Sequence, residues 1–122
     1  MTDKTFDTWE SIRRWCISYL EIFIKYAPLL DTQEGHQQYR DALNETPITW
    51  REVKRITDPN ARHIVDTITG VISESVATKS ALPGDFESAL KAVRAWIKVL
   101  HNNMDSKSTA QAISQIENDM LQ

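Results

Sequence analysis

Apolar residues recur at steps of three and four along most of this chain, and polar segments separate one apolar series from the next. Residues at these steps share one face of an α-helix, whereas strands alternate at steps of two. The pattern therefore predicts an all-α protein: a compact bundle of five or six helices in a single domain. The predicted helices cover residues 8–27, 32–44, 50–57, 59–77, 86–102 and 107–120.

Helix-start signals precede these apolar series. A capping box pairs a short polar side chain with a Glu three residues later, so that each satisfies the other's backbone N–H. Asp58 with Pro59 marks a further start, because proline loses no hydrogen bond in the first helical turn. We expect Asp85 and Asp105 to cap the last two helices. The capping boxes are Asp7 with Glu10, Asp31 with Glu34, and Thr49 with Glu52.

The first predicted helix carries an apolar arc that covers more than half of its circumference. Such an arc is too wide for one neighbouring helix to cover. Either the helix is surrounded within its own bundle, or part of it contacts a partner, which includes a second copy in a homodimer. Its polar stripe is Arg14, Ser18, Glu21 and Lys25. The arc consists of Trp9, Ile12, Trp15, Cys16, Tyr19, Leu20, Ile22, Phe23, Tyr26 and Ala27.

The most regular apolar seams lie in the helices predicted for residues 59–77 and 86–102. Ile68 and Trp96 are at the middle of these seams, which predicts that both are core residues. Gly70 falls on the side opposite the first seam. Either a neighbouring backbone comes close at that point, or the helix has a weak position there, because glycine costs about 1 kcal/mol of helix propensity.

The composition is that of a folded globular protein. The chain has 122 residues, of which 41% are hydrophobic and 25% are charged, and this is enough apolar surface to build a core. A single cysteine cannot form an internal disulfide. The N-terminus lacks the pattern of a secretory signal, and the most apolar stretch, residues 15–30, carries Glu21 and Lys25. We therefore expect a cytoplasmic protein that does not insert into a membrane.

The sequence shows no pattern typical of catalysis, so we expect a protein that is not an enzyme and holds no cofactor or metal. His36, His63 and His101 lack the neighbours that place metal ligands on one helix face. His63 and Asp66 are one turn apart and are expected to form a solvated pair. Cys16 lies within the apolar arc, which predicts a buried and inert thiol.

One helix face suggests a protein partner. Glu34, Gln38, Asp41 and Glu45 follow steps of four, three and four, and we call these four residues the acidic stripe. The stripe is expected to be exposed, opposite Tyr39 and Leu43. It is either a solvated outer face or a docking surface for a basic partner. The second interpretation predicts a protein-binding module, such as an immunity protein or antitoxin that covers a basic toxin surface.

Two basic clusters support an alternative function. Around a predicted turn, the first cluster loosely resembles the helix-turn-helix arrangement, in which a second helix enters the DNA major groove. This resemblance implies a DNA-binding regulator or a small helical subunit of a nucleoprotein complex. The net charge of −3 is unusual for such a protein, and solvated helix faces also explain both clusters. The first consists of Trp50, Arg51, Lys54, Arg55 and Arg62, and the second of Lys91, Arg94 and Lys98.

Overall fold

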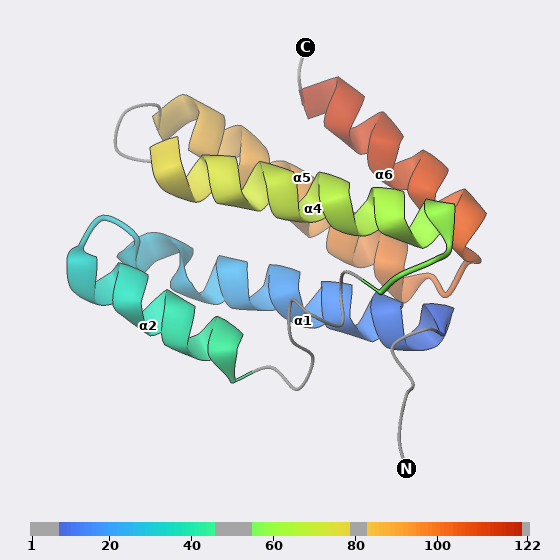
Figure 1. Ribbon diagram of the computed structural model, residues 1–122. Helices are drawn as coiled ribbons and strands as arrows, with labels where there is room; N and C mark the ends of the chain where they lie inside the picture. The colour runs from blue at the N-terminus through green and yellow to red at the C-terminus, as the bar shows by residue number, and fades with distance from the viewer. Residues whose placement is uncertain (1–7, 46–54, 79–82, 121–122) are drawn as a thin grey trace.

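The computed structural model describes residues 8–45, 55–78 and 83–120, and all regular structure within these residues is helical (Figure 1). This confirms the predicted all-α bundle. Apart from the helix predicted over residues 50–57, the helix boundaries agree with the predicted ones to within a few residues. The elements are α1 (Trp9–Tyr26), the short 3-10 helix η2 (Ala27–Leu29), α2 (Gln33–Asn44), α4 (Pro59–Thr78), α5 (Pro83–His101) and α6 (Ser106–Met120).

Helices α4, α5 and α6 pack against one another, and α1 lies beneath α4 and α5 in the view of Figure 1. Helix α2 folds back along α1 after η2 and contacts mainly these two elements. It therefore lies at the edge of the bundle (Figure 1). A helix with one principal neighbour leaves most of its circumference in solvent, which matches the low apolar content of α2.

Helix α1 is surrounded by α2, α4 and α5, which explains its wide apolar arc. Trp9, Ile22 and Tyr26 are only partly buried and lie at the margin of the core. The predicted polar stripe is exposed at all four positions. Burial within its own bundle thus accounts for the arc, and a homodimer through this helix stays a prediction. The buried residues are Ile12, Trp15, Cys16, Tyr19, Leu20 and Phe23.

The predicted seams of α4 and α5 form the centre of the core. Ile68 and Trp96 are both 0% exposed, which confirms their assignment. The indole Nε1 of Trp96 donates a hydrogen bond of 3.2 Å to the backbone carbonyl of Ile113, so a buried polar atom joins α5 to α6. Because a buried indole N–H needs an acceptor, this bond fixes how the two helices meet.

Two predicted caps are wrong by one residue. The cap of α1 is Thr8 rather than Asp7, and its Oγ1 accepts a hydrogen bond from the Ser11 N–H at 3.2 Å. The cap of α2 is Thr32 rather than Asp31, and it accepts from the Gly35 N–H at 2.9 Å. In both places a threonine follows the aspartate directly. A threonine hydroxyl satisfies the same backbone donors once the helix begins one residue later.

The caps predicted for α4 and α6 are confirmed. Asp58 Oδ1 accepts from the Asn60 N–H at 2.9 Å, and its Oδ2 accepts from the Ser106 hydroxyl at 2.8 Å. Asp105 Oδ1 accepts from the Ser108 N–H at 2.7 Å, a bond that lowers the pKa of the Asp105 carboxyl. One carboxylate, that of Asp58, thus caps α4 and ties its first turn to the start of α6.

The start predicted for α5 is wrong. The helix begins at Pro83 and not after a cap at Asp85. Proline is compatible with the first helical turn because the N–H that it lacks has no partner inside the helix there. Pro83 is therefore the first residue of the helix, which begins three residues before the predicted start at residue 86.

The helix predicted over residues 50–57 is wrong at its C-terminal end. Arg55 lies in a turn, residues 56–58 have no regular structure, and residues 50–54 lie outside the described part of the chain. Pro59 explains the difference, because the residue before a proline avoids helical backbone angles. Ile56 is buried in the core, so this irregular segment packs against the bundle just before α4 begins.

Gly35 in α2 and Gly70 in α4 have opposite surroundings. A Cβ atom built on Gly35 would collide with the carbonyl group of Leu29, whereas one built on Gly70 would have nothing within 4 Å. Gly70 is therefore a weak position in α4 and not a point of close approach. Gly35 is required by the fold, since it lets the first turn of α2 lie directly against the backbone of η2.

Candidate functional site

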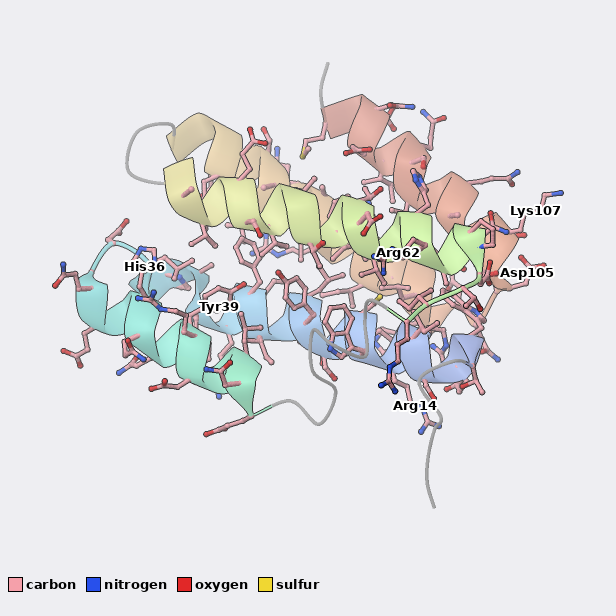
Figure 2. The ribbon with its side chains drawn as sticks, viewed as in Figure 1. Arg14, His36, Tyr39, Arg62, Asp105 and Lys107 are labelled. Atoms are coloured by element: carbon pink, nitrogen blue, oxygen red, sulfur yellow. The ribbon has the colours of Figure 1, made fainter. Side chains whose placement is uncertain are left out.

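The acidic stripe is exposed along the whole of α2. Glu34, Gln38, Asp41 and Glu45 are all exposed, as predicted. Tyr39, labelled in Figure 2, is buried on the other side of the helix. Its ring packs edge-on against Phe23 at 6.4 Å between centroids and lies 6.5 Å from Tyr26. These aromatic contacts hold α2 against α1 and so set the direction in which the stripe faces.

Little in the described part of the chain neutralises the stripe. Asp41 accepts a hydrogen bond of 2.9 Å from the Gln37 side chain. No ion pair joins Glu34, Asp41 or Glu45 to another residue of the described ranges, where the ion pairs are those of Glu10 on α1 and Asp66 on α4. The negative charge of α2 is thus directed to solvent, where it attracts cationic groups.

The structure describes only part of the first basic cluster. Arg55 is exposed in a turn, and Arg62 is half-buried near the start of α4. The Nε atom of Arg62 lies 3.7 Å from Asp66 Oδ2, so this guanidinium has an acidic neighbour on its own helix. Trp50, Arg51 and Lys54 lie outside the described residues. Of the five residues of the first basic cluster, the described part of the chain therefore includes two cations, and one of these is ion-paired.

The expected pair between His63 and Asp66 is wrong, because Asp66 pairs with Arg62 instead. His63 Nε2 lies 2.6 Å from the Ser114 hydroxyl, which connects α4 to α6. Both residues lie inside helices, where backbone N–H groups are already bonded and offer no oxyanion hole to an activated serine. This pair is a helix–helix contact. Within the described ranges, no three His, Cys, Asp or Glu side chains converge on a point where a metal ion could bind.

Cys16 is a buried thiol, as predicted. It is 0% exposed, and burial raises the pKa of its thiol to about 12. Burial also raises the pKa of Tyr19, one turn further along α1, to about 12. Because the thiolate is the reactive form of cysteine, a thiol that stays protonated at neutral pH is inert.

These two groups predict that the folded protein loses stability in alkali. An unfolded cysteine loses its proton near pH 9 and an unfolded tyrosine near pH 10, whereas the folded protein keeps both protons until about pH 12. Stability is therefore full below pH 9 and falls as the pH rises towards 12. Each group contributes a slope of up to about 1.4 kcal/mol per pH unit.

Urea unfolding between pH 7 and pH 11 measures this slope. The Cys16→Ala variant should show a smaller loss of unfolding free energy between pH 9 and pH 10 than the wild type, because it lacks the thiol. A wild-type stability that stays constant up to pH 11 would contradict the burial of both groups.

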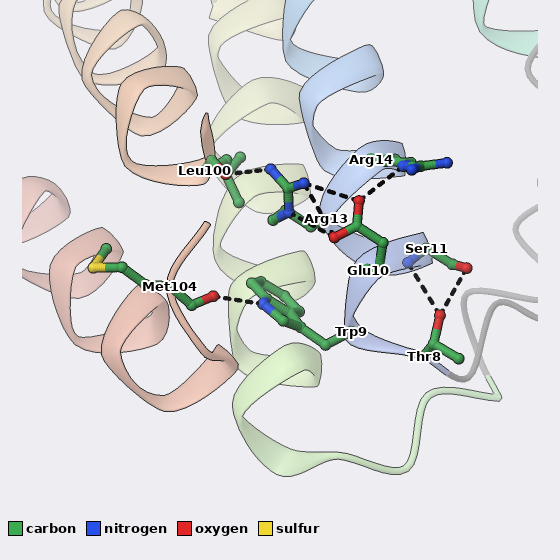
Figure 3. Close-up of polar contacts among 8 residues, drawn as sticks. All are labelled: Thr8, Trp9, Glu10, Ser11, Arg13, Arg14, Leu100 and Met104. Carbon is green, nitrogen blue, oxygen red and sulfur yellow. Dashed lines mark hydrogen bonds and ion pairs between the residues drawn. The ribbon is translucent and has the colours of Figure 1, made fainter. Parts of the chain in front are cut away.

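A charged cluster that the sequence does not reveal holds the start of α1 to the end of α5 (Figure 3). Arg13 donates from Nη1 to the Leu100 carbonyl at 2.7 Å and from Nη2 to Glu10 at 2.9 Å. Arg14 donates to the same carboxylate at 2.8 Å. The two guanidinium groups lower the pKa of Glu10. Trp9 donates from its indole N–H to the Met104 carbonyl at 2.7 Å. These side chains satisfy one carbonyl in the last turn of α5 and one in the connection between α5 and α6, and their role is structural.

No protein-family model matches the chain, and neither do any of the curated proteins or solved structures with which it was compared. None of the described helices combines the length and the apolar character that crossing a membrane would require. The argument for function therefore depends on the surfaces of the bundle.

Proposed function

We propose that this protein is a non-enzymatic binding module that uses the acidic stripe to cover a basic surface of a partner protein. It acts as a stoichiometric inhibitor, in the way that an immunity protein or an antitoxin acts on a basic toxin. The observation that carries this proposal is the position of the stripe. Four exposed residues follow one line along a helix at the edge of the bundle, and no described cation pairs with their three carboxylates.

The contacts that hold α2 against the bundle support the same function. Its start is held by the Thr32 cap and by the contact of Gly35 with Leu29, and its middle is held by the ring of Tyr39. A surface that is rigid before binding loses less conformational entropy on association. The uncompensated carboxylates accelerate the encounter with a cationic partner and orient it.

The described residues give less support to a nucleic-acid-binding function. Arg62 has an acidic neighbour, His63 is bonded to Ser114, and Arg55 lies in a turn and not in a helix. The recognition helix of a helix-turn-helix protein needs exposed side chains in its first turns that are free to contact base edges or phosphates. Capture of partners with and without nuclease, described next, distinguishes the two functions.

Reversing Glu34, Asp41 and Glu45 to Lys should weaken partner binding at least tenfold and leave the helical fold unchanged. Like charges would then face the basic surface of the partner. The protein is immobilised and its partners are captured from native cell extract, with and without nuclease, and each retained protein is then titrated by calorimetry. A tenfold loss corresponds to about 1.4 kcal/mol, and larger losses would place the stripe in a buried hot spot.

A matched control reverses Glu21, Glu87 and Glu117, which lie on α1, α5 and α6. It makes the same change in net charge and should retain the partner. If the stripe variant binds as well as the wild type, the acidic stripe is not the binding surface. If nuclease releases the retained protein, the nucleic-acid alternative replaces the proposal.

A further inference from the structure

An open apolar groove lies between α5 and α6, on a different helix pair from the acidic stripe. Its volume is about 460 Å³. The Trp96–Ile113 hydrogen bond joins the C-terminal half of α5 to the middle of α6, and the C-terminal end of α6 stands away from α5 in Figure 1. Small side chains at this point of α5 leave the space unfilled. The groove is lined by Ser88, Lys91, Ala92, Ala95, Ile116, Asp119 and Met120.

The groove has an apolar floor and is open to solvent. Ala92 is buried, and Ala95, Ile116 and Met120 are half-buried. A small molecule binds tightly when most of its surface is enclosed, which an open groove does not achieve. Side chains projecting from a helix need only one enclosed face, and helix-in-groove recognition places apolar anchors at steps of three and four in such a depression.

One edge of the groove is positively charged. Lys91 lines the groove, and Arg94 and Lys98 continue along the same exposed side of α5; we call these three residues the basic ridge. No ion pair joins them to any residue in the described ranges. Glu87 lies one turn before Lys91 on α5, so this side of the helix has a net positive charge from three cations and one anion. The opposite edge carries Asp119, which accepts a hydrogen bond of 3.0 Å from Gln115.

We propose that this groove binds an amphipathic helix of a partner protein, with apolar side chains in the groove and acidic side chains along the basic ridge. Lys91 and Lys98 are seven residues apart, so the ridge spans about 10 Å. A partner helix of roughly three turns reaches all three cations. Like-charge repulsion disfavours a basic helix at this edge. This surface is separate from the acidic stripe, so the two can be occupied at the same time.

Synthetic helical peptides test the proposal directly. Each peptide carries leucines at positions i, i+3, i+4 and i+7, which form one apolar face of the peptide helix. Along one side of this leucine face, one peptide carries glutamates and the other carries lysines. Binding of fluorescein-labelled peptide to the full-length protein is measured by fluorescence anisotropy at low salt. We expect the glutamate peptide to bind at least tenfold more tightly than the lysine peptide, and added salt to reduce this difference.

Two variants locate the binding. Ala95→Leu adds a side chain to the groove and should weaken the glutamate peptide at least tenfold. Its matched control is Ala77→Leu, an equal change at an exposed position of α4, which should bind as the wild type does. Lys91→Glu combined with Lys98→Glu should reverse the preference between the two peptides, whereas Lys25→Glu combined with Lys107→Glu should not. Circular dichroism verifies that each variant is helical.

Three results would overturn the proposal. The first is that the protein does not bind the peptides specifically in the groove. Either neither peptide binds at millimolar protein concentration, or each peptide binds the Ala95→Leu variant as tightly as the wild type. The second is that dodecanoate binds in a manner blocked by Ala95→Leu while the peptides do not, which would make the groove a site for a small anionic amphiphile. The third is a concentration-dependent dimer that Ala95→Leu abolishes, which would identify a second copy of this chain as the occupant.

Discussion

Replacing Gly35 by Ala should destabilise the protein by roughly 2–3 kcal/mol, although alanine is the better helix former. The methyl group would occupy space that the Leu29 carbonyl already fills. That carbonyl belongs to the backbone of η2, which cannot rotate aside as the end of a long side chain can. Relief would require α2 to move away from η2, and this would disturb the packing of Tyr39 against Phe23.

Gly70→Ala is the matched control, because the same methyl group meets nothing within 4 Å there. This variant should be more stable than the wild type by about 0.5–1 kcal/mol, the ordinary gain of helix propensity. Urea unfolding followed by circular dichroism gives both free energies. The expected result is two changes of opposite sign. Two stabilising changes would mean that α2 does not lie against η2 as the structure describes.

Trp96→Ala should cost about 3–5 kcal/mol, a large part of the stability of a domain of this size. The indole is fully buried between α5 and α6, and its N–H bonds the Ile113 carbonyl. Truncation would leave a cavity and also remove the side-chain hydrogen bond that joins these two helices. Thermal unfolding should show a large decrease in the melting temperature, or the variant should fail to fold.

Two further variants make this prediction specific. Trp96→Phe keeps most of the buried ring but lacks the N–H, so it should lose about 1–2 kcal/mol. Leu29→Ala removes a side chain that is 46% exposed, and it should change stability by less than about 0.5 kcal/mol. If both Trp96 variants unfold at the same temperature as the wild type, Trp96 is not at the centre of the core.

The periodicity of the sequence was sufficient to predict which side of each helix is buried. Ile68 and Trp96 lie in the core, Arg14 and Glu21 face solvent, and the acidic stripe is exposed. These predictions succeed because a helix places every residue at a set angle around its axis. Once the apolar side of a helix is buried, its polar side must face solvent, whichever neighbour provides the burial.

Local capping was predicted less well, for a physical reason. Thr8 and Thr32 follow aspartates that could serve equally as caps, and Pro83 can either precede a helix or begin one. Aspartate and threonine stabilise a helix N-terminus to a similar degree, so a cap at either residue changes the free energy of the helix by only a fraction of a kcal/mol. Packing of the rest of the helix then decides the position of the first turn. The end of the helix predicted over residues 50–57 is wrong because the residue before Pro59 avoids helical backbone angles. Asp58 caps α4 instead, and Ile56 is buried without being part of a helix.

The sequence by itself determined that this chain forms amphipathic helices, where their buried faces lie, and that one edge of α2 is acidic. Only the tertiary structure decided that Gly35 touches Leu29, that Arg13 reaches the Leu100 carbonyl, and that Ala95 borders a groove. Each of these depends on the distance between two elements far apart in the chain or across a turn. Helical periodicity specifies the direction in which a side chain points, but only the packed bundle specifies what lies there.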